Sequence, residues 1–244
     1  MELRVEGFSK RFADVAGAPA FSLNLPPLSF AMGGVTFVMG HNGSGKSVLI
    51  KLLCGQLTPE GKDVTLRYGD EVLRAREYHA PFVRQRAEES LSGDLTVREN
   101  LLLRLEPGDF LDRLLPERRL SSTVREVVKQ HPLLASKLDQ PVNELSSGQR
   151  QALAFLAVTA RRSVLLCLDE FLAATDHSTT LLLRDLARRY ATETPACVLI
   201  ASHDVELALE DAARILILKD GELVRDLIPG DSGWNRGSII DLLV

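Results

Sequence analysis

A glycine-rich loop of eight residues carries the clearest chemistry in this sequence. Its pattern is a glycine, four residues and then Gly-Lys-Ser, which is typical of loops that bind nucleotide phosphates. Glycines let the backbone bend so that successive N–H groups point at phosphate oxygens. Lys46 adds a full positive charge, and the Ser47 hydroxyl can ligate Mg²⁺. The alternative is an ordinary turn with a solvated lysine. The eight residues are Gly40, His41, Asn42, Gly43, Ser44, Gly45, Lys46 and Ser47.

The segments on either side of this loop favour phosphate binding. An apolar, strand-like run, Val35–Met39, precedes the loop, and a helix-like run, Val48–Leu53, follows it. The start of a helix adds unpaired N–H donors and partial positive charge to an anion site. We therefore include Val48, the first residue of that run, among the expected binding residues.

Two adjacent acids could complete such a site. Asp169 and Glu170 follow the apolar run Val164–Leu168, which has the pattern of a buried strand. A strand that ends in an acid places the carboxylate at the carboxyl end of the sheet, where ligands bind in α/β folds. In phosphate-loop enzymes an aspartate there helps to hold Mg²⁺, and Glu170 could orient or deprotonate an attacking water. The competing interpretation is a strand that ends in a charged turn.

Length and composition limit the possible classes of protein. The chain has 244 residues, 45% hydrophobic and 25% charged, enough for one large domain or two small ones. No apolar stretch approaches the ~20 residues that span a bilayer, and the first residues lack the plan of a signal peptide. The net charge of −4 provides no basic field, so we expect no nucleic-acid partner. Cys54, Cys167 and Cys197 lie in apolar surroundings, like small core residues in a reducing compartment.

Hydrophobic periodicity predicts an α/β fold with an N-terminal β-rich part and an inserted helical segment. Helical character runs from about Thr96 to Ala160 and opens with a capping box of Thr96 and Glu99. It includes a candidate helix over 121–130. The expected strands are 3–5, 21–25, 28–30, 64–68 (as an edge strand), 164–168, 197–201 and 215–218, and the later helices lie near 177–190 and 204–212.

The segment 145–151, Leu-Ser-Ser-Gly-Gln-Arg-Gln, has two interpretations, a capped helix start and an anion-binding motif, that are compatible with each other. Ser146 and Gln149 form a capping box at the start of a predicted helix, and a helix start is also a site for anions. The segment also resembles the signature sequence of ATP-binding cassette (ABC) ATPases, usually Leu-Ser-Gly-Gly-Gln. This resemblance implies that the Ser146 hydroxyl and the Gly148 amide face the γ-phosphate of ATP bound to a second subunit. Ser147 replaces the usual glycine, and it is counted with Gln149 among the nucleotide-binding residues.

Other motifs of the ABC family follow in the expected order. Gln85, just before the helical stretch, resembles the Q-loop glutamine, which in the family senses Mg²⁺ and the attacking water. The run 95–101 resembles the family's Leu-Thr-Val-x-Glu-Asn-Leu. His203 follows an apolar strand and resembles the switch histidine, which implies a hydrogen bond to the γ-phosphate. The alternative for Gln85 is an ordinary surface side chain. The alternative for His203 is a histidine at a helix start.

Two further matches depart in part from the family pattern. Asp176 resembles the aspartate of the D-loop, although Thr175 precedes it and Phe171 stands where the family usually has proline after the Asp-Glu pair. Phe12 resembles the aromatic residue that stacks on adenine. A phenylalanine of the core is the alternative for Phe12.

The resemblance spans residues 3–223 and implies one ABC ATP-binding domain over 1–244 with a phosphate-loop NTPase fold. A RecA-like core with a β subdomain would come from about 1–86 and 162–244, and a helical subdomain from about 87–161. The implied enzyme is an ATPase that uses ATP and Mg²⁺. Its implied catalytic residues are Lys46, Gln85, Glu170 and His203, and its implied Mg²⁺ ligands are Ser47, Gln85 and Asp169.

The implied partners are a transmembrane permease and a second copy of the chain or a paralogous ATPase, closed around two ATP molecules. Such an assembly places the chain at the cytoplasmic face of a membrane. Residues 138–143 lack the Gly-rich acidic form of many fused exporters, which favours a stand-alone subunit, as in an importer with a solute-binding protein. The alternatives are an ABC ATPase of iron–sulfur cluster assembly and a simple phosphate-loop kinase. The signature segment, Gln85 and His203 argue against the kinase.

Overall fold

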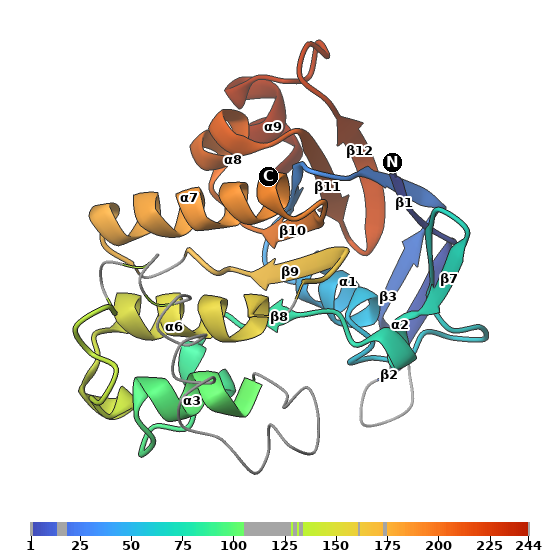
Figure 1. Cartoon of the computed structure of the whole chain (residues 1–244). Helices are drawn as coiled ribbons and strands as arrows, with labels where there is room; N and C mark the ends of the chain where they lie inside the picture. Colours follow the sequence, from blue (N-terminus) through green and yellow to red (C-terminus); the bar gives the residue numbers. More distant parts are fainter. Residues whose placement is uncertain are drawn as a thin grey trace. The chain divides into compact units, whose positions relative to one another are not determined.

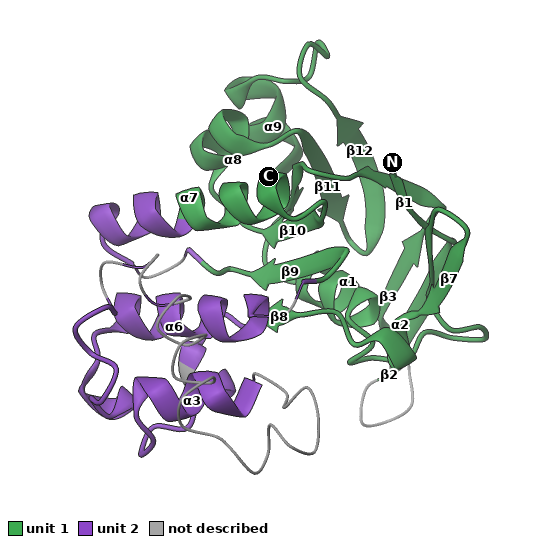
Figure 2. Ribbon diagram, in the orientation of Figure 1, with its two compact units in different colours: residues 1–82, 163–171, 184–244 green, residues 83–162, 172–183 purple. Residues whose placement is uncertain are grey.

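The structure, a computed structural model, describes residues 2–13, 19–104, 128, 131, 134–160, 162–172 and 175–243. The chain forms two compact units, each assembled from separate segments (Figure 2). Unit 1 comprises residues 1–82, 163–171 and 184–244, and unit 2 comprises residues 83–162 and 172–183. The predicted helix over 121–130 lies outside the described residues except for Val128, which is helical.

A four-stranded antiparallel sheet belongs to the N-terminal part of unit 1. Alternate residues of its first strand are buried, as the side-chain period of two requires. The prediction of an edge strand at 64–68 is wrong, because that strand pairs on both sides and lies inside the sheet. Local alternation cannot reveal how many neighbours a strand has. The order is β4-β1-β6-β7, with β1 (Glu2–Val5), β4 (Leu28–Ala31), β6 (Thr65–Tyr68) and β7 (Glu71–Arg74).

The second sheet has the order β2-β3-β12-β11-β5-β10-β9-β8 (Figure 1). Its central strands β11, β5, β10 and β9 are parallel, and β5, β9 and β10 are buried along their whole length. Burial on both faces explains their unbroken apolar runs. Because these strands are parallel, the loops after β5, β9 and β10 leave the same edge of the sheet. The strands are β2 (Phe8–Ala13), β3 (Pro19–Leu25), β5 (Val35–Met39), β8 (Phe82–Val83), β9 (Leu165–Asp169), β10 (Cys197–Ala201), β11 (Arg214–Lys219) and β12 (Glu222–Leu227).

Helix α1 (Lys46–Leu53) packs against β9 and β10 and anchors the phosphate-loop segment. Its apolar residues Leu49, Ile50, Leu52 and Leu53 are buried in the hydrophobic core of unit 1. Burial of each such side chain contributes about 1.5–3 kcal/mol to the free energy of folding, so this packing stabilises the position of α1. The three free cysteines are buried in the same core, as their apolar surroundings predicted.

The remaining helices of unit 1 are held partly by ion pairs. Arg184 joins two of them, because its Nε lies 2.5 Å from Asp211 Oδ2 and its terminal nitrogen lies 2.7 Å from Glu210 Oε2. The Asp211 side chain is only 4% exposed, so this pair is largely shielded from water. These helices are α2 (Ala75–Tyr78), α8 (Val205–Asp211), α9 (Arg236–Leu243) and the part of α7 (His177–Glu193) that begins at Arg184.

Helices make up most of the described part of unit 2. The predicted capping box begins α3: Thr96 N donates to Glu99 Oε2 at 2.8 Å, and Glu99 N donates to Thr96 Oγ1 at 3.2 Å. Helix α6 packs against α3 and η1. In the described ranges, no helix has both the length and the apolar character needed to cross a bilayer. Unit 2 contains η1 (Ala87–Ser90), α3 (Val97–Arg104), η2 (Val142–Glu144), α6 (Ser147–Thr159) and the beginning of α7.

Candidate active site

The phosphate loop connects the end of β5 to the start of α1, as its flanking sequence predicted. Gly45 is the N-cap of α1 and has φ 105°. A Cβ at Gly45 would lie 2.9 Å from a methyl carbon of Leu23 and 3.0 Å from the ring of Phe21, so both the conformation and the space require glycine. No side chain caps α1, so its first N–H groups are available to a phosphate.

Lys46 is held inside the loop by backbone carbonyl groups. Its Nζ donates to Gly40 O at 2.8 Å and to His41 O at 3.0 Å, and the residue is 5% exposed. Burial lowers the pKa of Lys46, and the charges of Glu170 and Asp169 oppose that shift. A phosphate anion in this loop would therefore stabilise the charged ammonium group.

Ser47 and Asp169 meet below the loop. The Ser47 Oγ donates a hydrogen bond to Asp169 Oδ1 at 2.9 Å. Burial raises the pKa of Asp169, and the hydrogen bond from Ser47 opposes the shift. A hydroxyl and a buried carboxylate are hard oxygen ligands of the kind that Mg²⁺ uses together with substrate phosphates, so the donor set fits that ion. Across the described ranges, no cluster of three or more His, Cys, Asp and Glu side chains offers a separate metal site.

Glu170 has an unusual backbone conformation next to Asp169. Its φ is 45°, in the left-handed region that a residue with a side chain rarely adopts. Its N–H donates to Ala201 O at 3.0 Å, which holds the turn against the end of β10. The following Phe171, in the place of the family's proline, is fully buried. This turn brings the Glu170 carboxylate to the cavity next to the phosphate loop.

His203 lies beside Glu170 at the end of β10. Its Nδ1 is 3.9 Å from Glu170 Oε1, and its side chain is 68% exposed. The helix start belongs to the next residue, because Asp204 is the N-cap of α8 and accepts from Leu207 N at 3.0 Å. His203 is therefore free of a capping role and lies where it can contact a ligand of the Glu170 cavity.

The phosphate loop opens into a cavity of about 500 Å³. Phe12 lines it as expected, and so does Phe21, which the sequence analysis did not include. The two rings are 6.2 Å apart, because Phe12 and Phe21 are paired across β2 and β3. That pairing is set by the register of two strands and has no local signal. The lining residues are Phe12, Phe21, Asn42, Gly43, Gly45, Lys46, Ser47, Val48 and Glu170.

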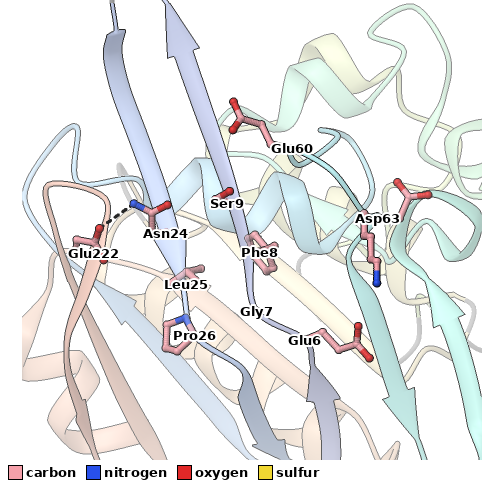
Figure 3. A pocket seen from close by; sticks show the side chains of 11 residues that line it. Glu6, Gly7, Phe8, Ser9, Asn24, Leu25, Pro26, Glu60, Asp63 and Glu222 are labelled. Carbon is pink, nitrogen blue, oxygen red and sulfur yellow. Dashed lines mark hydrogen bonds between the residues drawn. The ribbon is translucent and has the colours of Figure 1, made fainter.

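A larger cavity of about 670 Å³ lies elsewhere in unit 1 (Figure 3). Four carboxylates line it, and each already has a partner: Arg67 for Glu6, Arg11 for Glu60, Arg76 for Asp63 and Asn24 for Glu222. The lining has one basic side chain, Lys62, against these four acids, so its excess of negative charge disfavours phosphate groups. This cavity is therefore less suited to a nucleotide than the one at the phosphate loop.

The signature segment forms the start of α6 in unit 2. Ser146 is the N-cap, its Oγ accepts from Gln149 N at 3.3 Å, and its N–H donates to Gln149 Oε1 at 3.0 Å. The predicted capping box is thus present. Ser147 is the first helical residue and has no positive φ, so this position does not require the usual glycine. Gly148 follows as the second residue of the helix.

Asp176 and Gln85 also lie in unit 2. Asp176 immediately precedes α7, where it accepts from Thr179 N at 3.0 Å, from Thr179 Oγ1 at 2.7 Å and from Ser178 Oγ at 2.5 Å. The hydrogen bond from Ser178, followed by those from Thr179, holds the pKa of Asp176 far below its usual range. Gln85 is exposed in the connection between β8 and η1. Unit 1 therefore gathers the phosphate loop, Asp169, Glu170 and His203, and unit 2 gathers the signature segment with Asp176.

Comparisons with known proteins show which family and which fold this chain shares. Residues 23–173 match the family model described as ABC transporter. The chain is 31% identical over 243 residues to the phosphonates import ATP-binding protein PhnC of Frankia casuarinae, covering 94% of this chain and 91% of that protein. It is 28% identical over 230 residues to the tyrosine transport ATP-binding protein of Clostridioides difficile, covering 92% and 91%. Its fold matches cbiO1 of Clostridium perfringens, part of the ABC transporter complex cbiONQ, with a TM-score of 0.75, 22% identity and coverage of 93% and 88%.

Proposed function

The chain belongs to the ABC transporter family and is one of its ATP-binding ATPases; from this we propose that two copies close around two MgATP molecules and drive a membrane permease. The observation that carries the proposal is the Ser47–Asp169 hydrogen bond of 2.9 Å beneath a phosphate loop that also contains the buried Lys46. A cation, a loop whose N–H groups can bind phosphate, and a pair of oxygen donors therefore lie together. That combination suits a nucleoside triphosphate with its metal ion.

In the proposed site, each residue of unit 1 has a defined task. Lys46 and the loop amides stabilise negative charge on the transferring phosphoryl group. Ser47 and Asp169 would hold Mg²⁺, which neutralises phosphate charge when bound, and the family resemblance implies Gln85 as a further ligand. Phe12 offers a flat apolar face to the adenine, and Phe21 supports both that ring and the loop at Gly45.

Glu170 is the proposed base for hydrolysis. It would orient a water molecule toward the γ-phosphorus and accept the water proton as the bond to the ADP oxygen breaks. His203, whose Nδ1 lies 3.9 Å from the Glu170 carboxylate, would donate a hydrogen bond to the γ-phosphate. The turn that gives Glu170 its φ of 45° supports this role, because such strain concentrates at functional sites.

The second copy would complete the site from its unit 2. Ser146 and Gly148 stand at the start of α6, where unpaired N–H groups and partial positive charge suit the γ-phosphate. Ser147, Gln149 and Asp176 would accompany them. The γ-phosphate would then bridge Lys46 of one copy and the signature segment of the other. Hydrolysis would remove this bridge and release the two copies.

The proposed partner is a permease, and the proposed direction is import. Support comes from the names of the relatives, which are a phosphonates import and a tyrosine transport ATP-binding protein, and from the matched structure, which is part of a transporter complex. The chain would act on the cytoplasmic face of the membrane, and an importer would also use a solute-binding protein. The net charge of −4 favours protein partners over nucleic acid.

The experiment is nucleotide-driven dimerisation of the Glu170→Gln variant. We expect this variant to bind MgATP, to turn over at least about a hundredfold more slowly than the wild type and to accumulate as a dimer in light scattering. Glu60→Gln, an exposed carboxylate of the larger cavity, is the matched control and should behave like the wild type. A Glu170→Gln variant that binds MgATP only as a monomer would overturn the proposal.

A separate test addresses the permease. The chain carrying an affinity tag is purified from detergent-solubilised membranes of its own host, with and without MgATP. Recovery of a stoichiometric integral membrane protein supports the transporter role. Recovery of only soluble partners would favour a non-transport ABC ATPase instead.

A further inference from the structure

The starts of α6 and α7 are in close contact in unit 2, and the side chain of Thr179 lies between them. A Cβ built on Gly148 would lie 2.6 Å from Thr179 Cγ2 and 2.9 Å from Thr179 Oγ1. Both residues are buried, and Thr179 is 7% exposed. Gly148 does not have a positive φ, so glycine is required here by the closeness of Thr179 and not by backbone conformation.

The same threonine is fixed on its other side by Asp176. The Thr179 N–H donates to one carboxylate oxygen of Asp176 at 3.0 Å, and the Thr179 hydroxyl donates to the other at 2.7 Å. Side chains near a helix start point back toward its N-terminus, which allows this double contact. With its hydroxyl bound, the rotamer of Thr179 is set, and its methyl group is directed at Gly148.

We propose that Thr179 is a positioning residue that couples Asp176 to the start of α6. A displacement of Asp176 would move Thr179, and Thr179 would move Gly148 together with Ser146, because the space between Thr179 and Gly148 is too small for one more carbon atom. This inference rests on the proposed function, in which Ser146 and Gly148 bind ATP held by the other copy. Thr179 itself contacts neither nucleotide nor water in that scheme. Its role is to set where the signature segment stands.

The alternative is that Thr179 only helps to begin α7. Ser178 already donates to Asp176 at 2.5 Å, and the Thr179 N–H donates to Asp176 without any need for the Thr179 side chain. Loss of the side chain would then change stability but not the nucleotide-dependent contact between copies. The two roles are therefore separable by measurement.

The first measurement compares variants of Thr179 in the Glu170→Gln background. We expect Thr179→Ala to weaken MgATP-driven dimerisation by about tenfold, because a small misplacement of a binding group has a large effect. The affinity of the monomer for ATP should not change, because the phosphate loop belongs to unit 1. Thr192→Ala is the matched control and should dimerise normally, since among the described residues the Thr192 hydroxyl bonds to the Arg188 and Arg189 carbonyl oxygens of its own helix.

Two conservative variants test the methyl group and the hydroxyl of Thr179 separately. Thr179→Ser keeps the hydroxyl for Asp176 but removes the methyl group that faces Gly148, and Thr179→Val keeps the shape but removes the hydroxyl. Both should weaken dimerisation while preserving the fold. They also carry the test if Thr179→Ala fails to fold. Normal dimerisation by both variants would overturn the proposal.

The decisive measurement is a rescue. Gly148→Ala should impair dimerisation and lower the melting temperature by several degrees, because its Cβ overlaps Thr179. Adding Thr179→Ala removes the two nearest atoms and leaves the Thr179 Cβ at 3.3 Å, so the double variant should recover the melting temperature and part of the dimerisation. Additive damage in the double variant would overturn the coupling.

The outcomes also separate this inference from the proposed function. If the parent Glu170→Gln chain never dimerises with MgATP, the proposed function fails, and the coupling role fails with it. If that parent dimerises and every Thr179 variant does too, only the role of Thr179 is wrong.

Discussion

Ser47 and Asp169, which are 122 positions apart in the sequence, share a hydrogen bond of 2.9 Å beneath the phosphate loop. Ser47 is the second residue of α1 and Asp169 is the last residue of β9, so the bond joins the two segments that the sequence marks for phosphate and metal chemistry. Asp169 is buried, and no ion pair among the described residues includes it. It is therefore the residue whose properties should depend most on what occupies the site.

Asp169→Asn tests the proposed metal site. The amide oxygen can still accept the hydrogen bond from Ser47, but the negative charge that would hold Mg²⁺ is lost. We expect ATP affinity measured with Mg²⁺ to fall at least about tenfold, with a smaller change in its absence. Titration calorimetry measures both, and the exposed Asp185→Asn is the control. Equal losses with and without Mg²⁺ would show that Asp169 acts on ATP itself.

The same substitution tests how Asp169 couples stability to pH. Burial raises the pKa of Asp169 above its ordinary value of 3.8, so the folded chain holds this proton more tightly than the unfolded chain. The contribution of Asp169 to the free energy of unfolding therefore falls as the pH rises from 3.8 through the raised pKa. At neutral pH Asp169→Asn should raise the melting temperature of the nucleotide-free chain. The gain should shrink as the pH is lowered, and a lower melting temperature at neutral pH would contradict the assignment.

Lys46→Ala should abolish tight ATP binding. The ammonium group is 5% exposed and bonded only to loop carbonyl groups among the contacts in the described structure, so it is available to the outer phosphates. We expect a loss of at least about a hundredfold in affinity, typical of removing a buried charge contact. Fluorescence titration with a labelled ATP analogue measures it. Lys62→Ala, in the larger cavity, should bind normally, and unchanged affinity for Lys46→Ala would argue against the loop.

Phe12 and Phe21 should affect different parts of the nucleotide. Phe12→Ala should weaken ATP binding about tenfold through lost stacking and leave the binding of inorganic triphosphate unchanged. Phe12→Trp should retain ATP affinity. Phe21→Ala should weaken both ligands, because Phe21 also contacts the loop at Gly45. If Phe12→Ala and Phe21→Ala change the affinities for ATP and for triphosphate in the same way, Phe12 has no separate role at the adenine.

Arg184→Ala should destabilise unit 1 more than any exposed ion pair can. It would leave the Asp211 carboxylate, 4% exposed, without its main partner, a change that costs about 3–5 kcal/mol for buried pairs. Arg189→Ala removes a pair whose side chains are 49% and 63% exposed and should cost less than about 1 kcal/mol. Urea unfolding compares the two variants. Equal losses would show that Asp211 is solvated in solution.

Local sequence features predicted the parts of the site that depend on neighbours in the chain. The phosphate loop, the capping boxes at Thr96 and Ser146 and the buried strands β5, β9 and β10 all depend on residues within a few positions of one another. Short-range hydrogen bonds and burial patterns leave a signal at that distance.

Features that depend on strand register or on helix contacts were not predictable. Phe21 joins the cavity because it pairs with Phe12 across two strands, and the strand at 64–68 is internal because β7 covers its free side. The contact of Thr179 with Gly148 depends on two helices that are separated by β9 in the chain. A single sequence contains no periodicity that reports such pairings.

The burial of every cysteine has a practical consequence for spectroscopy. Cys54, Cys167 and Cys197 are all shielded in the core, and burial raises the pKa of the Cys197 thiol to about 12 and that of Cys167 well above its usual range. Buried thiols are shielded from maleimides, and the raised pKa values of Cys167 and Cys197 leave little reactive thiolate at those two positions. A cysteine introduced at Leu103, which is 67% exposed, would thus become the one reactive handle for a fluorophore in the native background. Distance changes between two labelled copies could then be followed through the ATP cycle without first removing any native sulfur.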